Sequence, residues 1–383
     1  MGFEKCESDH CIYLKRDGQE MIFVALYVDN LILASSSDKL LKNTKQVLSD
    51  RFEMTAMGQF KSFLGMEIDH DETTGNGATK FANDILENFN MEKSNPVKTP
   101  QYPGLKLTKA MGEGGCKHDE TMANVPYRNA VGCLMYLMVG TRPDLAAAVG
   151  VLSQFAADPC PMHWHALKRV FRYIQGTKPH SIEFQANCDR GLEGYSDADW
   201  AGDIESRRST SGYVFIMNGG CICWRSKKQR TVALSEATQE AVWLKVFLCE
   251  LGEMASDEAV KIYEDNQGSI ALAKNPECHK RTKHLDIRYH FVRERVEDGQ
   301  VVLEYISTLD MLADFMTKPI PATQFGVLRS KLGSEAPKAA ESSGSVGKKM
   351  PRRAATYQLD TGGTFTQCHH HHSREYALVI GRG

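Results

Sequence analysis

The sequence lacks both long hydrophobic runs and an excess of charge of one sign. No apolar stretch approaches the ~18 residues that a membrane-spanning helix needs, so we expect no membrane span. The 46 Lys and Arg residues nearly balance the 48 Asp and Glu residues, which excludes a strongly basic nucleic-acid binder as a description of the whole chain. The first 17 residues are too charged for a secretory leader. We therefore expect an intracellular protein of the cytoplasm or nucleus.

Cysteine is present, but not in the patterns that indicate disulfides or zinc. The 11 Cys residues include no C-x-x-C pair. Cys6, His10 and Cys11 lack a second pair of ligands at zinc spacing, as do Cys116 and His118. We interpret the thiols as reduced and mostly buried, which agrees with an intracellular location.

The most informative stretch runs from Gly194 to Ser235 and is typical of a β-meander. We predict strands over 195–200, 211–217 and 221–226, where aromatic and branched residues gather. Asn218-Gly219-Gly220 between the last two is a strong hairpin signal. Alternation along the first strand places Asp197 and Asp199 on one face. Such a pair is often only a turn or a cap, so its meaning depends on what lies downstream.

Two further acidic side chains stand at comparable places downstream. Asp265 follows a short apolar strand at Ile262–Tyr263, and a helix is predicted to begin near Gln267. Asp314 lies on a helix after an apolar strand at Val301–Ile306. Carboxylates at strand ends and on one helix can converge on Mg²⁺ or Mn²⁺, and paired ions of this kind assist phosphodiester cleavage.

Several segments of this region occur in the order found in one known family. They are GYSDADWAGD, RRSTSGYVF, W-x-SKKQ, VALS, EDNQGSIALAKNP, RTKHLDIRYHFVRE and MLADFMTKP. The stretch Gly194–Gly333 closely resembles the ribonuclease H region of copia-type LTR retrotransposon polyproteins. The resemblance implies cleavage of the RNA strand of RNA–DNA hybrids with two metal ions, Mg²⁺ or Mn²⁺. It also implies that Asp197, Asp265 and Asp314 are the metal ligands, whereas Asp286 belongs to the preceding helix near the substrate backbone.

The segment after VALS departs from the family pattern. The family continues with a segment of type S-T-E-A-E-Y-M-A-L, whose first Glu is the remaining metal ligand, but here VALS runs directly into EATQEAVWLKVFLCELG. The loss of about eleven residues is roughly three helical turns, so Val242, Phe247 and Leu251 still face the core. Thr238 takes the position of the Glu, and Glu236 or Glu240 is a possible substitute. We expect weakened metal binding and impaired cleavage.

Basic residues cluster around the acidic segments. A run of positive charge is usually a solvated face, but beside a phosphodiester site phosphate contact is equally reasonable. The candidate nucleic-acid-binding residues are Arg207, Arg208, Lys227, Lys228, Arg230 and Lys283, with Arg225, Lys280 and Arg281 nearby. The expected partner is an RNA–DNA hybrid or another nucleic acid, and the oligomeric state stays open.

The first hundred residues resemble a different part of the same family. Strands are predicted at 12–14, 21–27 and 31–34, with Tyr27-Val28-Asp29-Asn30 at a hairpin tip. This resembles the palm hairpin of the family's reverse transcriptases, whose tip reads Y-V-D-D and binds metal. Asn30 replaces the second Asp, and an amide holds a hard cation poorly. The third Asp of such a site would precede Met1, so we expect no polymerase activity.

The remaining segments are predicted from periodicity and composition. Helices are expected over 38–52, 81–91 and 125–176, and a strand over 63–68. In the long helical region, Val131, Leu134, Met135 and Met138 form one apolar stripe. The polar segment 95–119 reads as a linker, and 334–383 as a disordered tail.

These expectations combine into one architecture. We predict an α/β chain with a truncated reverse transcriptase palm and thumb remnant at 1–95, a linker and helical connection at 96–190, a ribonuclease H-like mixed five-stranded sheet with helices at 191–333, and a tail at 334–383. Because both catalytic sets are incomplete, activity is left open. The alternatives are a non-catalytic nucleic-acid-binding scaffold and a degenerate transposon-derived protein.

Overall fold

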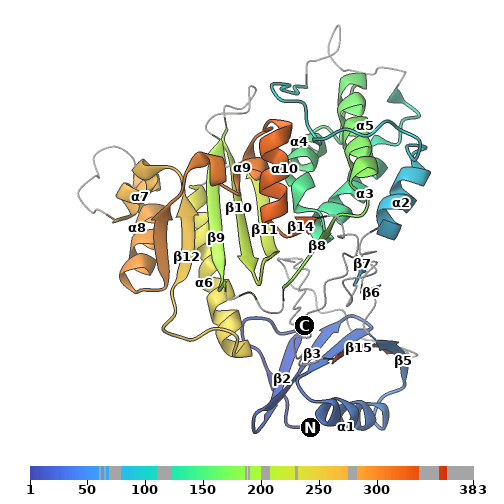
Figure 1. The fold of residues 1–383 in the computed structure, drawn as a ribbon, viewed down its shortest axis with the longest axis vertical. Coiled ribbons are helices and arrows are strands. Elements are labelled where there is room, and N and C mark those ends of the chain that lie inside the picture. Colours follow the sequence, from blue (N-terminus) through green and yellow to red (C-terminus); the bar gives the residue numbers. More distant parts are fainter. Residues whose placement is uncertain are drawn as a thin grey trace, which may run out of the picture.

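The computed structural model confirms the α/β class and contains two main sheets, with a group of helices packed beside one of them (Figure 1). It describes residues 1–59, 62–63, 66–68, 79–109, 122–185, 188, 190–199, 208–228, 232–274, 283–335 and 353–359. Among the described helices, none combines the length and the apolarity that a bilayer crossing requires.

The N-terminal sheet has six strands in the order β1-β2-β3-β4-β15-β5. Its helix α1 is capped by Ser37, whose side chain accepts from the Leu40 amide, and packs its apolar face on β3 and β4. Helix α1 ends at Ser49, three residues before the predicted end. The elements are β1 (Glu4–Lys5), β2 (Ile12–Asp17), β3 (Glu20–Tyr27), β4 (Asn30–Ser35), α1 (Asp38–Ser49), β5 (Met54–Gln59) and β15 (Arg353–Leu359).

The C-terminal tail supplies one strand of this sheet. Strand β15 lies between β4 and β5 and is antiparallel to both, so that Ala355 is paired with Leu33 on one side and Gln59 on the other. The expectation of disorder throughout 334–383 is therefore wrong for this segment and for Ser334–Glu335, which forms β14 against β8 (Ser181–Ile182). The polar, Gly- and Ser-rich composition suggested disorder, but the backbone of β15 forms hydrogen bonds with a strand on each side.

The single strand predicted over 63–68 is instead a pair of two-residue strands. Strands β6 (Ser62–Phe63) and β7 (Met66–Glu67) are antiparallel, with Phe63 opposite Met66. Helix α2 follows at Thr79–Asn88, close to the predicted position, and its Ile85 and Leu86 are fully buried.

The predicted helical region is a group of three α-helices and one 3-10 turn. They are α3 (Tyr127–Gly140), η2 (Pro143–Leu145), α4 (Ala146–Ser153) and α5 (Pro161–Gly176). Val131 and Leu134 are buried as expected and Met138 is partly buried, but Met135 is 43% exposed. The buried face of α3 is centred on Leu134, and the next residue points about 100° away around the helix.

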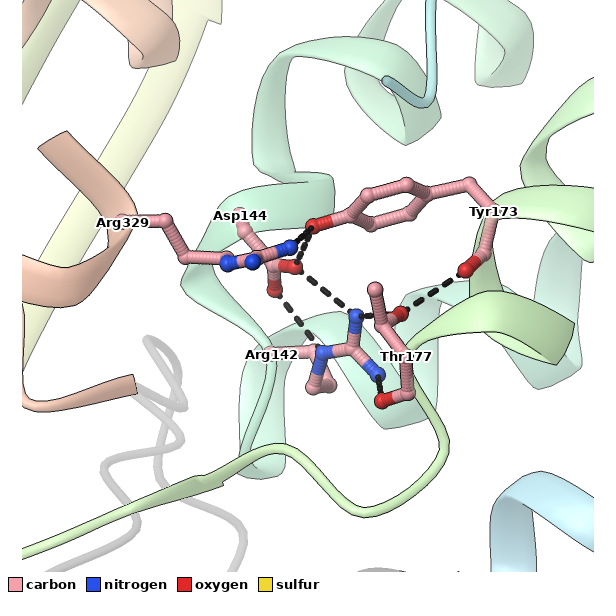
Figure 2. Close-up of polar contacts among 5 residues, drawn as sticks. All are labelled: Arg142, Asp144, Tyr173, Thr177 and Arg329. Atoms are coloured by element: carbon pink, nitrogen blue, oxygen red, sulfur yellow. Dashed lines mark hydrogen bonds and ion pairs between the residues drawn. The ribbon is translucent and has the colours of Figure 1, made fainter. Parts of the chain in front are cut away.

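A buried polar network joins these helices to the C-terminal part of the chain (Figure 2). Arg142 makes a bidentate ion pair with Asp144 through Nε and Nη2. Its Nη1 donates to the backbone oxygen of Thr177, and Nη2 also donates to the Thr177 hydroxyl. The Tyr173 hydroxyl donates to Asp144 at 2.5 Å and accepts from Arg329 of α10. Burial raises the pKa of Asp144, but Arg142 lowers it more, so the carboxylate stays ionised.

The second sheet has the predicted five strands, in the order β11-β10-β9-β12-β13. Strands β9, β10 and β11 are antiparallel, whereas β12 is parallel to both β9 and β13. Asn218 and Gly219 have positive φ at the predicted hairpin. The strands are β9 (Glu193–Asp199), β10 (Thr210–Met217), β11 (Gly220–Lys228), β12 (Val260–Glu264) and β13 (Val301–Tyr305).

Helices cover both faces of this sheet. Helix α6 and the α7–α8 pair pack on one face, and α9, α10 and the α3–α5 group share a core with the other (Figure 1). The hydrophobic core therefore runs without interruption from the helical region into the sheet. The elements are α6 (Ala233–Leu251), α7 (Gln267–Lys274), α8 (Lys283–Glu297), η3 (Thr308–Asp310), α9 (Asp314–Thr317) and α10 (Ala322–Lys331).

The C-terminal end of α6 contacts the N-terminal sheet. Phe247 and Leu251 are buried, as expected, but they pack with Cys6 and Ile12 rather than with the five-stranded sheet. The Arg16 guanidinium donates to the backbone oxygen of Glu250 at 2.8 Å. Helix α6 is thus the element that joins the two sheets.

Candidate metal centre

Three carboxylates meet at one edge of the five-stranded sheet. Asp197 is near the end of β9, Asp265 directly follows β12, and Asp314 is the first residue of α9. Since β9 and β12 are parallel neighbours, their carboxyl ends lie at the same edge. One ligand oxygen from each residue lies within 4.8 Å of the others. This is the only such group of three or more within the described ranges.

The third carboxylate depends on a close approach between α9 and β10. Gly212 of β10 is paired with Asp197, and a Cβ atom added there would lie 2.6 Å from Met316 Cβ and 2.9 Å from Thr317 Cγ2. Only glycine leaves room for α9 at this position. The sequence signal was Gly212 within RRSTSGYVF, but only the packing reveals its role.

Two threonines contact the carboxylates and orient them. The Thr317 hydroxyl makes a short contact with Asp197 Oδ2, and the Thr308 hydroxyl donates to Asp265 Oδ2 at 2.7 Å. Neither residue was singled out from the sequence. Because an oriented carboxylate loses less freedom on binding a ligand, these contacts favour a defined ligand geometry.

A lysine lies between two of the carboxylates. Lys318 Nζ is 2.7 Å from Asp314 Oδ1 and 3.8 Å from Asp197 Oδ2. Burial lowers the pKa of Lys318, but the neighbouring carboxylates raise it more, so the ammonium form is favoured. The sequence contained this lysine in MLADFMTKP without indicating its contacts.

Burial and neighbouring like charges raise the pKa values of two acidic side chains at this edge, Asp314 and Glu264. Burial raises the pKa of Asp314 to about 6, with Asp197 and Asp265 adding to the effect and Lys318 opposing it. Burial, followed by the charges of Asp197 and Asp265, raises the pKa of Glu264 to about 8. A divalent cation would relieve this repulsion. The donor set of three carboxylates, all oxygen ligands, therefore fits Mg²⁺ or Mn²⁺.

The candidate substitutes on α6 lie outside the group of three. Glu236 accepts from the Ser211 hydroxyl at 3.1 Å, and buried Glu240 accepts from the Tyr213 hydroxyl at 2.9 Å. Thr238 is fully buried, and its hydroxyl donates to the Leu234 backbone oxygen. Both Glu side chains are therefore engaged with β10.

Of the six candidate nucleic-acid-binding residues, three have described side chains. Arg208 and Lys227 are exposed, and Lys228 is half-buried. Arg207 and Arg230 lie outside the described residues, as do the side chains of Lys283 and Asp286 at the start of α8.

A cavity of about 890 Å³ opens between β11 and the helical region. Lys227 and Lys228 line it, together with Asp199 and with two further basic residues, Lys106 and Arg169. Arg169 stacks on Tyr102 at 3.8 Å and donates to the Thr99 hydroxyl, so it also fixes the linker. Positive charge thus faces a space that reaches Asp199, two residues from the carboxylate group.

The hairpin tip of the N-terminal sheet carries one carboxylate, Asp29, next to the amide of Asn30. Val28 and Asp29 form the turn between β3 and β4, and Tyr27 is paired with Asn30. Within the part of the chain that the structure describes, Asp29 belongs to no group of three metal-ligand side chains.

Comparison with known proteins agrees with these observations. Residues 1–103 match the family model described as reverse transcriptase (RNA-dependent DNA polymerase). The retrovirus-related Pol polyprotein from transposon TNT 1-94 of Nicotiana tabacum is 41% identical over 343 residues, 86% of this chain and 26% of that protein. The corresponding polyprotein from transposon RE2 of Arabidopsis thaliana is 36% identical over 344 residues, 87% of this chain and 23% of that protein.

A shorter relative matches part of the chain at higher identity. Secreted RxLR effector protein 161 of Plasmopara viticola is 69% identical over 135 residues, which cover 33% of this chain and 95% of that protein. The chain spans about a quarter of the length of the two Pol polyproteins. Together with the segments that predicted the resemblance, these matches establish that the chain belongs to the copia-type family of retrotransposon Pol polyproteins and includes reverse transcriptase sequence.

Proposed function

We propose that the centre of Asp197, Asp265 and Asp314 binds divalent cations and hydrolyses the RNA strand of RNA–DNA hybrids, at a rate reduced by the missing glutamate. The observation that carries this proposal is the convergence of the three carboxylates within 4.8 Å at the carboxyl edge of β9 and β12. Bound Mg²⁺ or Mn²⁺ would supply an activated water and stabilise charge on the scissile phosphate.

The chain's own residues would hold and orient these components. Asp197, Asp265 and Asp314 are the proposed ligands, and Thr308 and Thr317 fix two of them. Arg208, Lys227 and Lys228 would contact the phosphate backbone, because hybrids are recognised by shape, backbone and 2′-hydroxyl groups. This surface and the reduced thiols suit an intracellular protein of the cytoplasm or nucleus.

The contacts of α6 support the expected impairment. Glu236 and Glu240 are bonded to hydroxyl groups of β10, and Thr238 offers no carboxylate. A metal site that lacks one carboxylate binds its ions less tightly and places them less accurately, and small misplacements reduce rates by about 100-fold. We expect no polymerase activity, because Asn30 follows Asp29 at the hairpin tip.

The test is hybrid cleavage with labelled RNA in Mg²⁺ and in Mn²⁺. The unmodified chain should cleave about 100-fold more slowly than a variant in which the Glu-containing segment is restored after Ser235. Asp197→Asn should abolish cleavage by the restored variant. Rapid cleavage by the unmodified chain, lost in Asp197→Asn, would disprove the impairment, and an inactive, folded restored variant would disprove the nuclease assignment.

A second candidate is a non-catalytic nucleic-acid-binding scaffold, which the basic lining of the cavity favours. In that case hybrid binding should depend on salt and survive Asp265→Asn and Asp314→Asn. Absence of binding at low salt would exclude it.

The remaining alternative is a degenerate transposon-derived protein that does not fold stably. A cooperative unfolding transition in soluble protein would be evidence against this alternative.

A further inference from the structure

Lys318 is held beside the carboxylate group by its own backbone. Its amide donates to the Asp314 backbone oxygen at 3.0 Å, which ends α9. Its φ and ψ of −143° and 152° are extended, as expected for a residue that precedes a proline, here Pro319. From this position the side chain reaches Asp314 at the start of α9.

The Lys318 ammonium group lies beside two buried carboxylates. Nζ lies 2.7 Å from Asp314 Oδ1 and 3.8 Å from Asp197 Oδ2. The two carboxylate side chains are 2% and 6% exposed, whereas the lysine side chain is 33% exposed. Without a cation, buried like charges at this separation repel strongly, and Lys318 reduces that repulsion.

The same position conflicts with a divalent ion. A cation bound by Asp314 and Asp197 would lie within a few ångströms of Nζ, and two positive charges at that separation repel. The lysine can move because its side chain is partly exposed and flexible. Asp197 is more constrained, because it contacts the Thr317 hydroxyl and lies within β9.

We propose that Lys318 is a positioning residue, an internal counter-ion that holds Asp197 and Asp314 together in the metal-free protein and leaves Asp314 when a divalent cation binds. This inference rests on the proposed metal-dependent function. Part of the cation's binding energy is then used to displace the ammonium group of Lys318.

The test is Mn²⁺ affinity, measured by electron paramagnetic resonance of the free ion on the full chain. Lys318→Met should bind Mn²⁺ about tenfold more tightly than the unmodified protein, because the competing charge is gone. Its melting temperature in chelator should be lower, and Mn²⁺ should raise that temperature by more. Lys318→Arg, which keeps the charge, should not gain affinity.

Lys331→Met is the matched control. Lys331 makes a similar pair with Asp310, with Nζ 2.6 Å from Oδ1, but both side chains are about half exposed and lie outside the carboxylate group. Its removal should leave Mn²⁺ affinity unchanged. Lys318→Gln provides a second neutral variant if Lys318→Met fails to fold.

The outcomes separate this inference from the proposed function. If the unmodified protein binds Mn²⁺ and the neutral variants bind it equally or more weakly, the counter-ion role of Lys318 is wrong and the metal centre stands. If neither the unmodified protein nor the neutral variants bind Mn²⁺, the proposed function fails and this inference fails with it. If only the neutral variants bind Mn²⁺, the result would support the proposal that a cation must displace the Lys318 ammonium group.

Discussion

His180 shows how one side chain makes stability depend on pH. It is 9% exposed, and burial, followed by the positive charges of Arg329 and Arg142, lowers the pKa of its imidazole to about 4. The ordinary value is 6.5. Above pH 6.5 the imidazole is neutral in both the folded and the unfolded protein, so it has little effect on stability. As the pH falls from 6.5 towards 4, the unfolded protein binds a proton that the folded protein does not, and the free energy of unfolding decreases.

The unmodified protein should lose about 2 kcal/mol of unfolding free energy between pH 7 and pH 4.5 that His180→Gln does not lose. Denaturant unfolding of both proteins at both pH values measures this difference. The carboxylates titrate in both proteins, so their effect cancels in the comparison. Parallel loss of stability in the two proteins would show that His180 is not the responsible group.

Helix α9 is the element on which the carboxylate group depends, and Gly212 controls its distance from the sheet. Gly212→Ala places a Cβ atom 2.6 Å from Met316 Cβ, so α9 must move away and take Asp314 with it. We expect about 1–3 kcal/mol of destabilisation and at least a tenfold loss of Mn²⁺ affinity.

Gly326→Ala on α10 serves as the control, since an added Cβ atom meets nothing within 4 Å there. That change should be neutral or stabilise by up to about 1 kcal/mol, because alanine favours helix. Thermal unfolding and Mn²⁺ titration measure both variants. A Gly212→Ala protein with unchanged Mn²⁺ affinity would show that α9 tolerates the shift.

At the same scale, the sequence predicted the elements better than the contacts between them. Aromatic, branched and apolar runs, separated by turn residues, located the five strands, and the ends of β9 and β12 located Asp197 and Asp265. The approach of Lys318 to Asp197 and the close approach of α9 at Gly212 were not predictable, because each joins residues more than a hundred positions apart. Phe247 illustrates the difference, since its burial followed from helix phase but its partners did not.

Segments from the two ends of the sequence pair in the N-terminal sheet. Strand β15 is paired along its length with β4 and β5, more than 290 residues earlier. Composition suggested disorder because the tail as a whole is polar and rich in Gly and Ser, whereas the sheet provides backbone partners on both sides of β15. Such distant pairing makes loop closure costly, so β15 is expected to join the sheet late in folding.

Removal of residues 353–383 should therefore expose the inner edges of β4 and β5. Their amides, over 30–35 and 54–59, should exchange hydrogen faster by at least tenfold, because each strand loses a neighbour. Amides of β9 and β10 should keep their protection, since those strands bond only within the five-stranded sheet. Removal of 360–383 alone is the control and should change neither set. If β4 and β5 stay equally protected in the longer truncation, β15 contributes no stability to the N-terminal sheet, and the tail can be treated as an independent segment.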